Sequence, residues 1–264
     1  MDERLKANLD AWNQMARIHA GSRGYRLAEF KAGQNVLKPI ELREVGDVRG
    51  KSLLHMQCHF GLDTMSWARM GANVTGVDFS DEAIKLARSI SGELKIPAQF
   101  VQSNIYDAPD VVHEQFDIVF TSYGALCWLP DITRWAQVAA SFVKPGGFFY
   151  MAEFHPLALM HDNRAGTTKL VQEISYFHAA MIVDPPGPDY SDSSKTVSET
   201  HQWLYRLGDV VSALASTGLR IEYLHEFAEC IHPHFPFMKQ SSDGLWYIEG
   251  DPIPTIFSIK ATKP

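Results

Sequence analysis

The sequence predicts an α/β fold built on a doubly wound, mostly parallel β-sheet. Short apolar runs alternate with segments of helical periodicity, which is the order of elements that a parallel sheet requires. The first repeat spans residues 52–80, which read as strand, tight turn, helix and strand, and its second strand ends in the carboxylate of Asp78. The chain has 264 residues, 45% of them hydrophobic, so it can bury one large core or a core with a cap.

Charge and composition exclude several classes of function. The net charge is −7 and the pI is about 5.9, so no overall basic field attracts nucleic acid. No apolar run approaches the ~20 residues of a membrane-spanning helix, and we expect no membrane partner. The three cysteines form no CxxC pair, which indicates a reducing cytoplasm. Cys230, His232 and His234 alternate without further ligands at suitable spacing, so we predict no metal site.

Residues 1–50 precede the first core strand and are predicted to form helices. Apolar side chains at helical spacing predict a helix over residues 6–18 and a second one over residues 25–42, with Pro39 as a kink or a first-turn residue. Residues 21–24 break the pattern, and a hinge would fall there. The side chains near this break that are candidates to line a pocket are His19 and Tyr25.

The rest of the chain continues the alternation. Ser80 is a predicted helix N-cap because two acids follow it in the first turn. Pro-Gly-Gly at residues 145–147 ends one helix and leads into a strand. The predicted core elements are strands over residues 52–56, 73–78, 99–102, 116–121, 148–154, 219–228 and 254–261, and helices over residues 131–142 and 207–216.

Residues 155–205 interrupt this order. Alternating apolar and polar side chains predict a strand over residues 168–178 and a return strand over residues 196–205, with a proline-rich turn between them. We expect an inserted β-hairpin that caps the carboxyl edge of the sheet.

The turn at residues 57–61 predicts a nucleoside site. Asp78 lies 17 positions after Gly61, near the roughly 20 that separate a nucleotide-binding turn from its ribose-binding acid. An ionised carboxylate there can accept hydrogen bonds from two vicinal ribose hydroxyls. Gln57 and His59 stand where dinucleotide turns carry glycine, and the turn has no lysine or arginine. A nucleoside without phosphates therefore fits better than a dinucleotide.

Residues 52–154 resemble the class I S-adenosylmethionine-dependent methyltransferases in unbroken order. The resemblance rests on the turn with its acidic strand, on Phe-Asp-Ile-Val at residues 116–119, and on Lys-Pro-Gly-Gly at residues 144–147. The chain departs from the family at the replaced turn glycines and at His55, where the family has an acid. The resemblance implies a Rossmann-like sheet of seven strands, the last of them antiparallel.

The resemblance also implies S-adenosylmethionine as methyl donor and S-adenosylhomocysteine as product. Asn104 matches the position of an acid that commonly meets the adenine amino group, and its side-chain oxygen can accept the same hydrogen bond. Phe79 is a candidate to pack on the adenine. The cofactor-binding candidates are Tyr25, His55, Gln57, Cys58, Gly61, Asp78, Phe79, Asn104, Ile105 and Ser122.

The predicted organisation has four parts. Residues 1–50 form an N-terminal helical lid, residues 51–154 the S-adenosylmethionine-binding core, residues 155–205 the inserted cap, and residues 206–264 complete the sheet. Family members often cover the ligand with N-terminal helices, which would make Trp12 part of a lid. The alternative is that Trp12 only packs on the core.

Methyl transfer requires the nucleophile, the methyl carbon and the sulfur in line, and a general base helps where the nucleophile is a hydroxyl. His155 follows the fifth strand at the binding edge of the sheet, and Glu153 lies two residues earlier on the same side. Tyr123 is a candidate to face the sulfonium, and His201 in the cap is a second candidate base.

We therefore expect a cytoplasmic methyltransferase that acts by in-line displacement on an oxygen or nitrogen atom of a small-molecule acceptor, as a monomer or a homodimer. One alternative is a nicotinamide-dependent Rossmann oxidoreductase, against which the missing turn glycines count. The other is a protein that binds a nucleoside ligand without catalysis.

Overall fold

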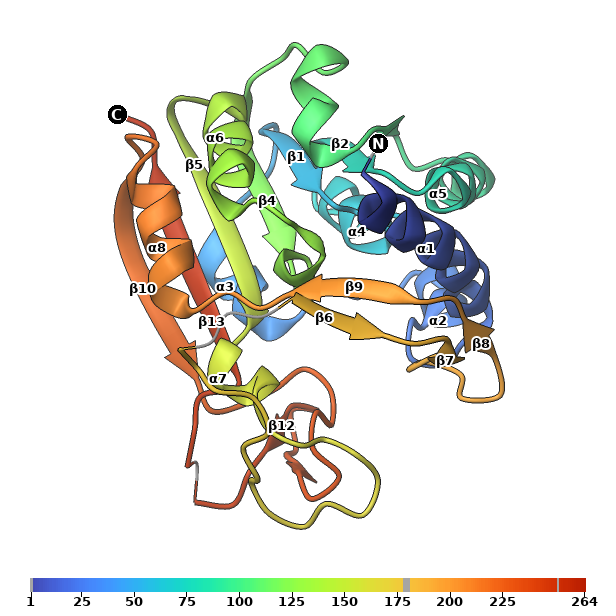
Figure 1. Ribbon diagram of the computed structural model, residues 1–264. Helices are drawn as coiled ribbons and strands as arrows, with labels where there is room; N and C mark the ends of the chain where they lie inside the picture. The colour runs from blue at the N-terminus through green and yellow to red at the C-terminus, as the bar shows by residue number, and fades with distance from the viewer. Residues whose placement is uncertain (1, 178–180, 251) are drawn as a thin grey trace.

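A computed structural model describes residues 2–177, 181–250 and 252–264. Within these residues seven strands form one central sheet in the order β10-β13-β5-β4-β1-β2-β3 (Figure 1). Strands β1 to β5 run parallel, and β13 lies antiparallel between β5 and β10, which confirms the predicted sheet. Its strands are β1 (Ser52–Met56), β2 (Asn73–Asp78), β3 (Ala98–Gln102), β4 (Phe116–Ser122), β5 (Val143–Phe154), β10 (Arg220–Phe227) and β13 (Ile256–Thr262).

Helices pack on both faces of this sheet, because alternate side chains of a strand point to opposite faces. On β4, Val119 belongs to the same core cluster as Trp135. The neighbouring Phe120 belongs to a different core cluster, where it packs edge-on against Trp67. The core helices are α4 (Leu62–Arg69), α5 (Asp81–Leu94), α6 (Ile132–Phe142) and α8 (Leu207–Ala215), with short 3₁₀ helices η1 (Ile105–Asp110) and η2 (Leu126–Trp128). Ser80 caps α5 as predicted, since its hydroxyl accepts from the N–H of Ala83.

The N-terminal segment forms α1 (Glu3–Gly21), α2 (Leu27–Lys31) and α3 (Pro39–Val45). The prediction of one helix over residues 25–42 was wrong. Gly33 has a φ of +99° shortly after the end of α2, and Pro39, which has no N–H, stands at the start of α3. The chain between these two residues is therefore not helical.

The insertion follows α7 (Pro156–Leu159) and forms two short antiparallel ladders, β6 (Met181–Asp184) with β9 (Thr200–Trp203) and β7 (Gly187–Pro188) with β8 (Thr196–Val197). The predicted strand over residues 168–178 was wrong, since residues 168–177 form no strand; His178 lies outside the described residues. Val171 and Phe177, two apolar side chains of this segment, are exposed and do not pack in a core that would stabilise a strand.

Helix α1 lies against both the core and the insertion (Figure 1). The Asn8 side chain holds the backbone of His201 on β9, accepting from its N–H at 2.7 Å and donating to its carbonyl at 2.8 Å. Asn13 donates to Asp81 at the start of α5 and accepts from Ser80. These contacts join the N-terminal helix to the carboxyl edge of the sheet.

The loop between β10 and β13 carries a short pair, β11 (Lys239–Gln240) with β12 (Trp246–Tyr247). Among the helices in the described ranges, none has the length and apolarity needed to cross a membrane.

Candidate functional site

The turn after β1 has an unusual backbone. Gln57, His59 and Gly61 all have positive φ angles, of 56°, 51° and 77°. A left-handed conformation costs a non-glycine residue roughly 1–2 kcal/mol, so the surroundings must stabilise the first two. The Gln57 side chain does so by donating to the carbonyl of Ala125 after β4 and accepting from the indole N–H of Trp135, each at 3.2 Å. The turn is thereby tied to the loop that follows β4.

Gly61 is the turn position with no room for a side chain. A Cβ there would lie 2.5 Å from the Phe100 ring, whereas a Cβ on Gly146, which has the same φ of 77°, would meet nothing within 4 Å. We expect Gly61→Ala to lower the free energy of unfolding by about 2–4 kcal/mol, from backbone strain and overpacking together. Gly146→Ala should cost about 1 kcal/mol, the strain alone. Chemical denaturation of both variants measures the difference, and equal losses would contradict it.

The Asp78 carboxylate faces this turn from the end of β2. One oxygen accepts from the N–H of His59 at 2.8 Å and the other from the N–H of Ser80 at 2.9 Å. Burial raises the pKa of this carboxyl to about 6, although the hydrogen bonds from the backbone oppose the shift. Each oxygen keeps a further lone pair, so an ionised Asp78 can hold the turn and still accept from a ligand.

Helix α1 and the insertion reach the same turn through a buried chain of polar groups. The two ring nitrogens of His19 lie 3.0 Å from Nε2 of His59 and 3.1 Å from a carboxylate oxygen of Asp189, which follows β7. Tyr25 stacks on the His19 ring, and its hydroxyl meets that of Tyr190. Burial lowers the pKa of His59 well below its ordinary value, so its imidazole is neutral near pH 7. The N-terminal segment and the insertion therefore meet over the turn.

Three buried polar atoms at this edge have no hydrogen-bond partner within the described part of the chain: Trp12 Nε1, His55 Nε2 and His59 Nδ1. An unpaired buried polar atom costs roughly 1–3 kcal/mol, and a polar ligand would remove that cost. His55 donates to or accepts from Thr64 through Nδ1 at 2.8 Å, and burial lowers its pKa to about 3. Its neutral ring cannot replace the charge of a carboxylate.

Other predicted cofactor residues have different neighbours. The Asn104 side-chain oxygen accepts from the N–H of Tyr106 and caps η1, so it is already engaged. Ser122, at the end of β4, donates to Asp63 at 3.3 Å, and burial raises the pKa of that carboxyl. Cys58 and Ile105 are buried, and Phe79 is half-buried.

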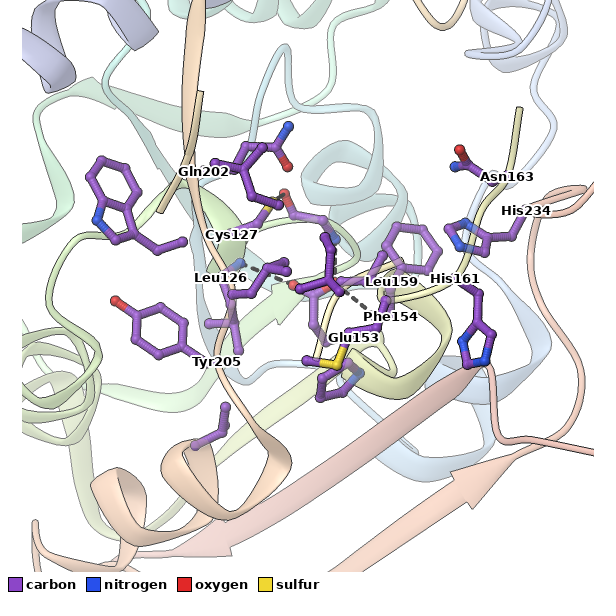
Figure 2. A pocket seen from close by; sticks show the side chains of 18 of the residues that line it. Leu126, Cys127, Glu153, Phe154, Leu159, His161, Asn163, Gln202, Tyr205 and His234 are labelled. Atoms are coloured by element: carbon purple, nitrogen blue, oxygen red, sulfur yellow. Dashed lines mark hydrogen bonds between the residues drawn. The ribbon is translucent and has the colours of Figure 1, made fainter. Parts of the chain in front are cut away.

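A pocket of about 440 Å³ lies beyond the ends of β4 and β5, under the insertion (Figure 2). Glu153 is at its centre in this view, with His161 and His234 on one side and Gln202 and Tyr205 on the other. Its lining also includes Gly124, Leu126, Cys127, Phe154, Glu173, Asp184 and Trp203.

Glu153 organises the floor of this pocket. Its carboxylate accepts from the backbone N–H groups of Gly124, Ala125, Leu126 and Phe154, the last three at 2.8, 3.1 and 2.7 Å. Burial raises the pKa of the carboxyl, while these donors lower it. The Gly124–Leu126 loop that Glu153 holds is also the loop that Gln57 contacts, so it borders both the turn and the pocket.

Of the four catalytic candidates from the sequence, Glu153 is the one that lines the pocket. His155 instead caps α7, where its Nδ1 accepts from the N–H of Leu157 at 3.1 Å and its Nε2 lies 2.9 Å from Glu226. Both ring nitrogens are therefore engaged away from the pocket.

The two other candidates are also held by neighbouring carboxylates. Tyr123 donates to Glu41 at 2.7 Å, and burial raises the pKa of this carboxyl to about 7. His201 lies 3.2 Å from Glu199, and its Nδ1 is buried without a partner among the described residues. Sequence reasoning missed Cys127, Asp184, Gln202 and Asp189, because their placement follows from contacts between distant segments.

Comparison with known proteins relates the chain to methyltransferases. A family model described as a methyltransferase domain matches residues 54–151. The ubiquinone biosynthesis O-methyltransferase of Shewanella pealeana is 33% identical over 128 residues, 47% of this chain and 53% of that protein. The protein of the same name from Xanthomonas euvesicatoria pv. vesicatoria is 31% identical over 177 residues, 66% of this chain and 70% of that protein.

A solved S-adenosylmethionine dependent methyltransferase from Mesorhizobium loti has a similar fold, with a TM-score of 0.59 at 21% identity, covering 84% of this chain and 95% of that one. The match to the first curated relatives spans about half of their length.

Proposed function

Since the chain belongs to the class I S-adenosylmethionine-dependent methyltransferases, we propose that it transfers a methyl group from S-adenosylmethionine to an oxygen or nitrogen atom of a small-molecule acceptor. The observation that carries this proposal is the buried Asp78 carboxylate, tied to the turn after β1 and with lone pairs left for a ribose. S-adenosylhomocysteine is the product, because the acceptor's lone pair forms the bond to the methyl carbon while the carbon–sulfur bond breaks.

The residues around the turn fit such a ligand. Asp78 would accept from the ribose hydroxyls, and the unpaired atoms of Trp12, His55 and His59 offer hydrogen bonds to a polar ligand without requiring a phosphate. The meeting of α1 with the insertion over the turn would exclude water from the reacting atoms. The Asn104 oxygen that caps η1 keeps a second lone pair, so it can still accept from the adenine amino group.

The pocket beyond β5 is the proposed acceptor site. The Gly124–Leu126 loop borders both the pocket and the turn, so an acceptor there would meet the donor beside this loop. Glu153 is a positioning residue in this proposal, since its oxygens hold the loop rather than a proton of the acceptor. His155 and His201 are left with structural roles.

The proposal includes the cellular compartment of the protein and the kind of molecule that it binds. Its three cysteines are free thiols, which supports the cytoplasm as its compartment. An acidic chain favours a small molecule over nucleic acid as partner. A nicotinamide enzyme is disfavoured, since Gln57 and His59 carry side chains where dinucleotide-binding turns have glycine.

Binding of S-adenosylhomocysteine is expected to weaken below pH 6. The ionised form of Asp78 accepts from the ribose, and its pKa is raised to about 6, so below that pH a proton must be lost before binding. The dissociation constant should rise by about fivefold between pH 6 and pH 5, as the ionised fraction falls from one half to about one tenth. Burial lowers the pKa values of His19 and His59, which face the same turn.

Calorimetric titration at several pH values between 5 and 8 measures this dependence. The same titration tests the proposal itself, because folded protein that binds neither S-adenosylmethionine nor S-adenosylhomocysteine would exclude it. Tight binding of NADH instead would favour the oxidoreductase, and donor binding without turnover of any acceptor would favour the binding protein. An affinity that stays flat from pH 8 to 5 would exclude Asp78 as the titrating group.

A further inference from the structure

The pocket beyond β5 has an uneven distribution of charge. Among the described residues that line it are the carboxylates Glu153, Asp184 and Glu173, and no lysine or arginine. A cation offsets one of the three, since Arg164 pairs with Glu173 at the exposed rim. Asp184 accepts from the amide of Gln202 at 2.5 Å, and the donors to Glu153 are uncharged backbone groups. Glu153 and Asp184 therefore have no cationic partner among the described lining residues.

These two carboxylates act on the same region of the pocket. Cys127 lies on the floor beside the Gly124–Leu126 loop, and burial raises the pKa of its thiol far above the ordinary value. The charges of Glu153 and Asp184, which line the same pocket, both contribute to this rise. A bound anion would meet the same repulsion as the thiolate, whereas a cation would be attracted.

The rest of the lining also suits an organic cation. Phe154, Trp203 and Tyr205 are among the lining residues, and aromatic faces attract cations, as the Arg4 guanidinium 5.8 Å from the Trp203 ring shows. On the opposite side, Nε2 of His234 is buried and has no partner within the described ranges, so it can bind a polar group of the ligand. The pocket thus combines negative charge, aromatic surface and one free polar atom.

We propose that the acceptor is a small organic amine, bound in this pocket as a cation with its ammonium group at Asp184. This inference rests on the proposed function, because it names the class of acceptor for the same site. Anionic acceptors such as carboxylates and phosphates are excluded by the charge of the pocket. The nucleophile of the acceptor faces the Gly124–Leu126 loop, beside which the donor would be reached.

The test compares three probes of one shape: 2-phenylethylamine, 2-phenylethanol and phenylacetate. Their affinities are measured by calorimetry at pH 7, with and without S-adenosylhomocysteine. We expect the amine to bind at least about tenfold more tightly than the alcohol, and phenylacetate not to bind at millimolar concentration. Asp184→Asn should reduce the affinity for the amine by about ten- to a hundredfold and leave the alcohol unchanged.

Asp47→Asn is the matched control, because it removes the same charge from an exposed residue that pairs with Arg49 before β1. It should leave all three affinities unchanged. Equal binding of amine and alcohol, preferential binding of phenylacetate, or no binding of any probe would each overturn the inference. Full amine affinity in Asp184→Asn would overturn the assignment to Asp184.

The two proposals fail in different ways in this experiment. Binding of S-adenosylhomocysteine without any preference for the amine would remove the acceptor class and leave the methyltransferase. Preference for the amine without binding of S-adenosylhomocysteine would remove the methyltransferase and leave a cation-binding pocket.

Discussion

Replacing Asp78 by alanine is expected to weaken S-adenosylhomocysteine binding by at least about a hundredfold. The variant would lose charge-assisted hydrogen bonds to the ribose, worth about 1.5–3 kcal/mol each. It would also leave the N–H groups of His59 and Ser80 without the acceptor that holds the turn in place. Two lost bonds correspond to about 3 kcal/mol or more, which is a factor above a hundred. Calorimetric titration measures the loss.

Asp78→Asn separates the charge from the shape of the side chain. The amide keeps one acceptor oxygen and the same volume, so we expect a smaller loss of affinity and none of the dependence on pH between 5 and 6. Circular dichroism shows whether each variant is folded. If folded Asp78→Ala binds S-adenosylhomocysteine as the wild type does, Asp78 has no role in holding the ligand.

The strands of the core were predictable within a few residues because local signals agree there. Apolar runs are bounded by glycine, proline or capping residues, and their alternation matches the two buried faces of the sheet. The same sequence patterns predicted secondary structure incorrectly in two segments outside the core. Residues 168–177 alternate like a strand but pair only through an isolated bridge between Gln172 and His161. Residues 25–42 have helical spacing that Gly33 and Pro39 interrupt. Pattern alone does not show whether a segment finds a buried partner.

The sequence predicted which residues lie at the carboxyl edge of the sheet, but not which side chains they contact there. In a parallel sheet Gly61 and Asp78 must lie at the carboxyl edge, and sequence order suffices to place them. The imidazole of His19 meets Asp189, 170 positions away, and that contact depends on how the insertion folds back. His155 follows its strand as expected, yet its ring is held by Glu226 of another strand. Position along the chain could not decide where that ring points.

Replacing Glu153 by glutamine is expected to destabilise the protein by about 3 kcal/mol or more and to slow methyl transfer at least about tenfold. The amide nitrogen of glutamine would face backbone donors that now point at a carboxylate, and each buried donor left unpaired costs roughly 1–3 kcal/mol. The Gly124–Leu126 loop would shift, and the positions of donor and acceptor relative to each other would change. Denaturant unfolding gives the stability, and single-turnover assays give the rate.

Glu173→Gln is the control for stability, because Glu173 also lines the pocket but is exposed and pairs with Arg164. It should change the free energy of unfolding by no more than about 0.5 kcal/mol. Comparable stability of the two variants would contradict the anchoring role of Glu153.

The pH dependence of the remaining activity separates positioning from proton transfer. The carboxylate of Glu153 has two oxygens and accepts four backbone N–H groups, so its lone pairs are occupied and no position is left for a proton from the acceptor. A general base would impose its own pKa on the rate, and the glutamine variant would lose that limb of the profile. A residue that only holds the loop would lower the rate at every pH alike. We expect the second result, because the geometry leaves Glu153 to position the loop on which both ligands meet.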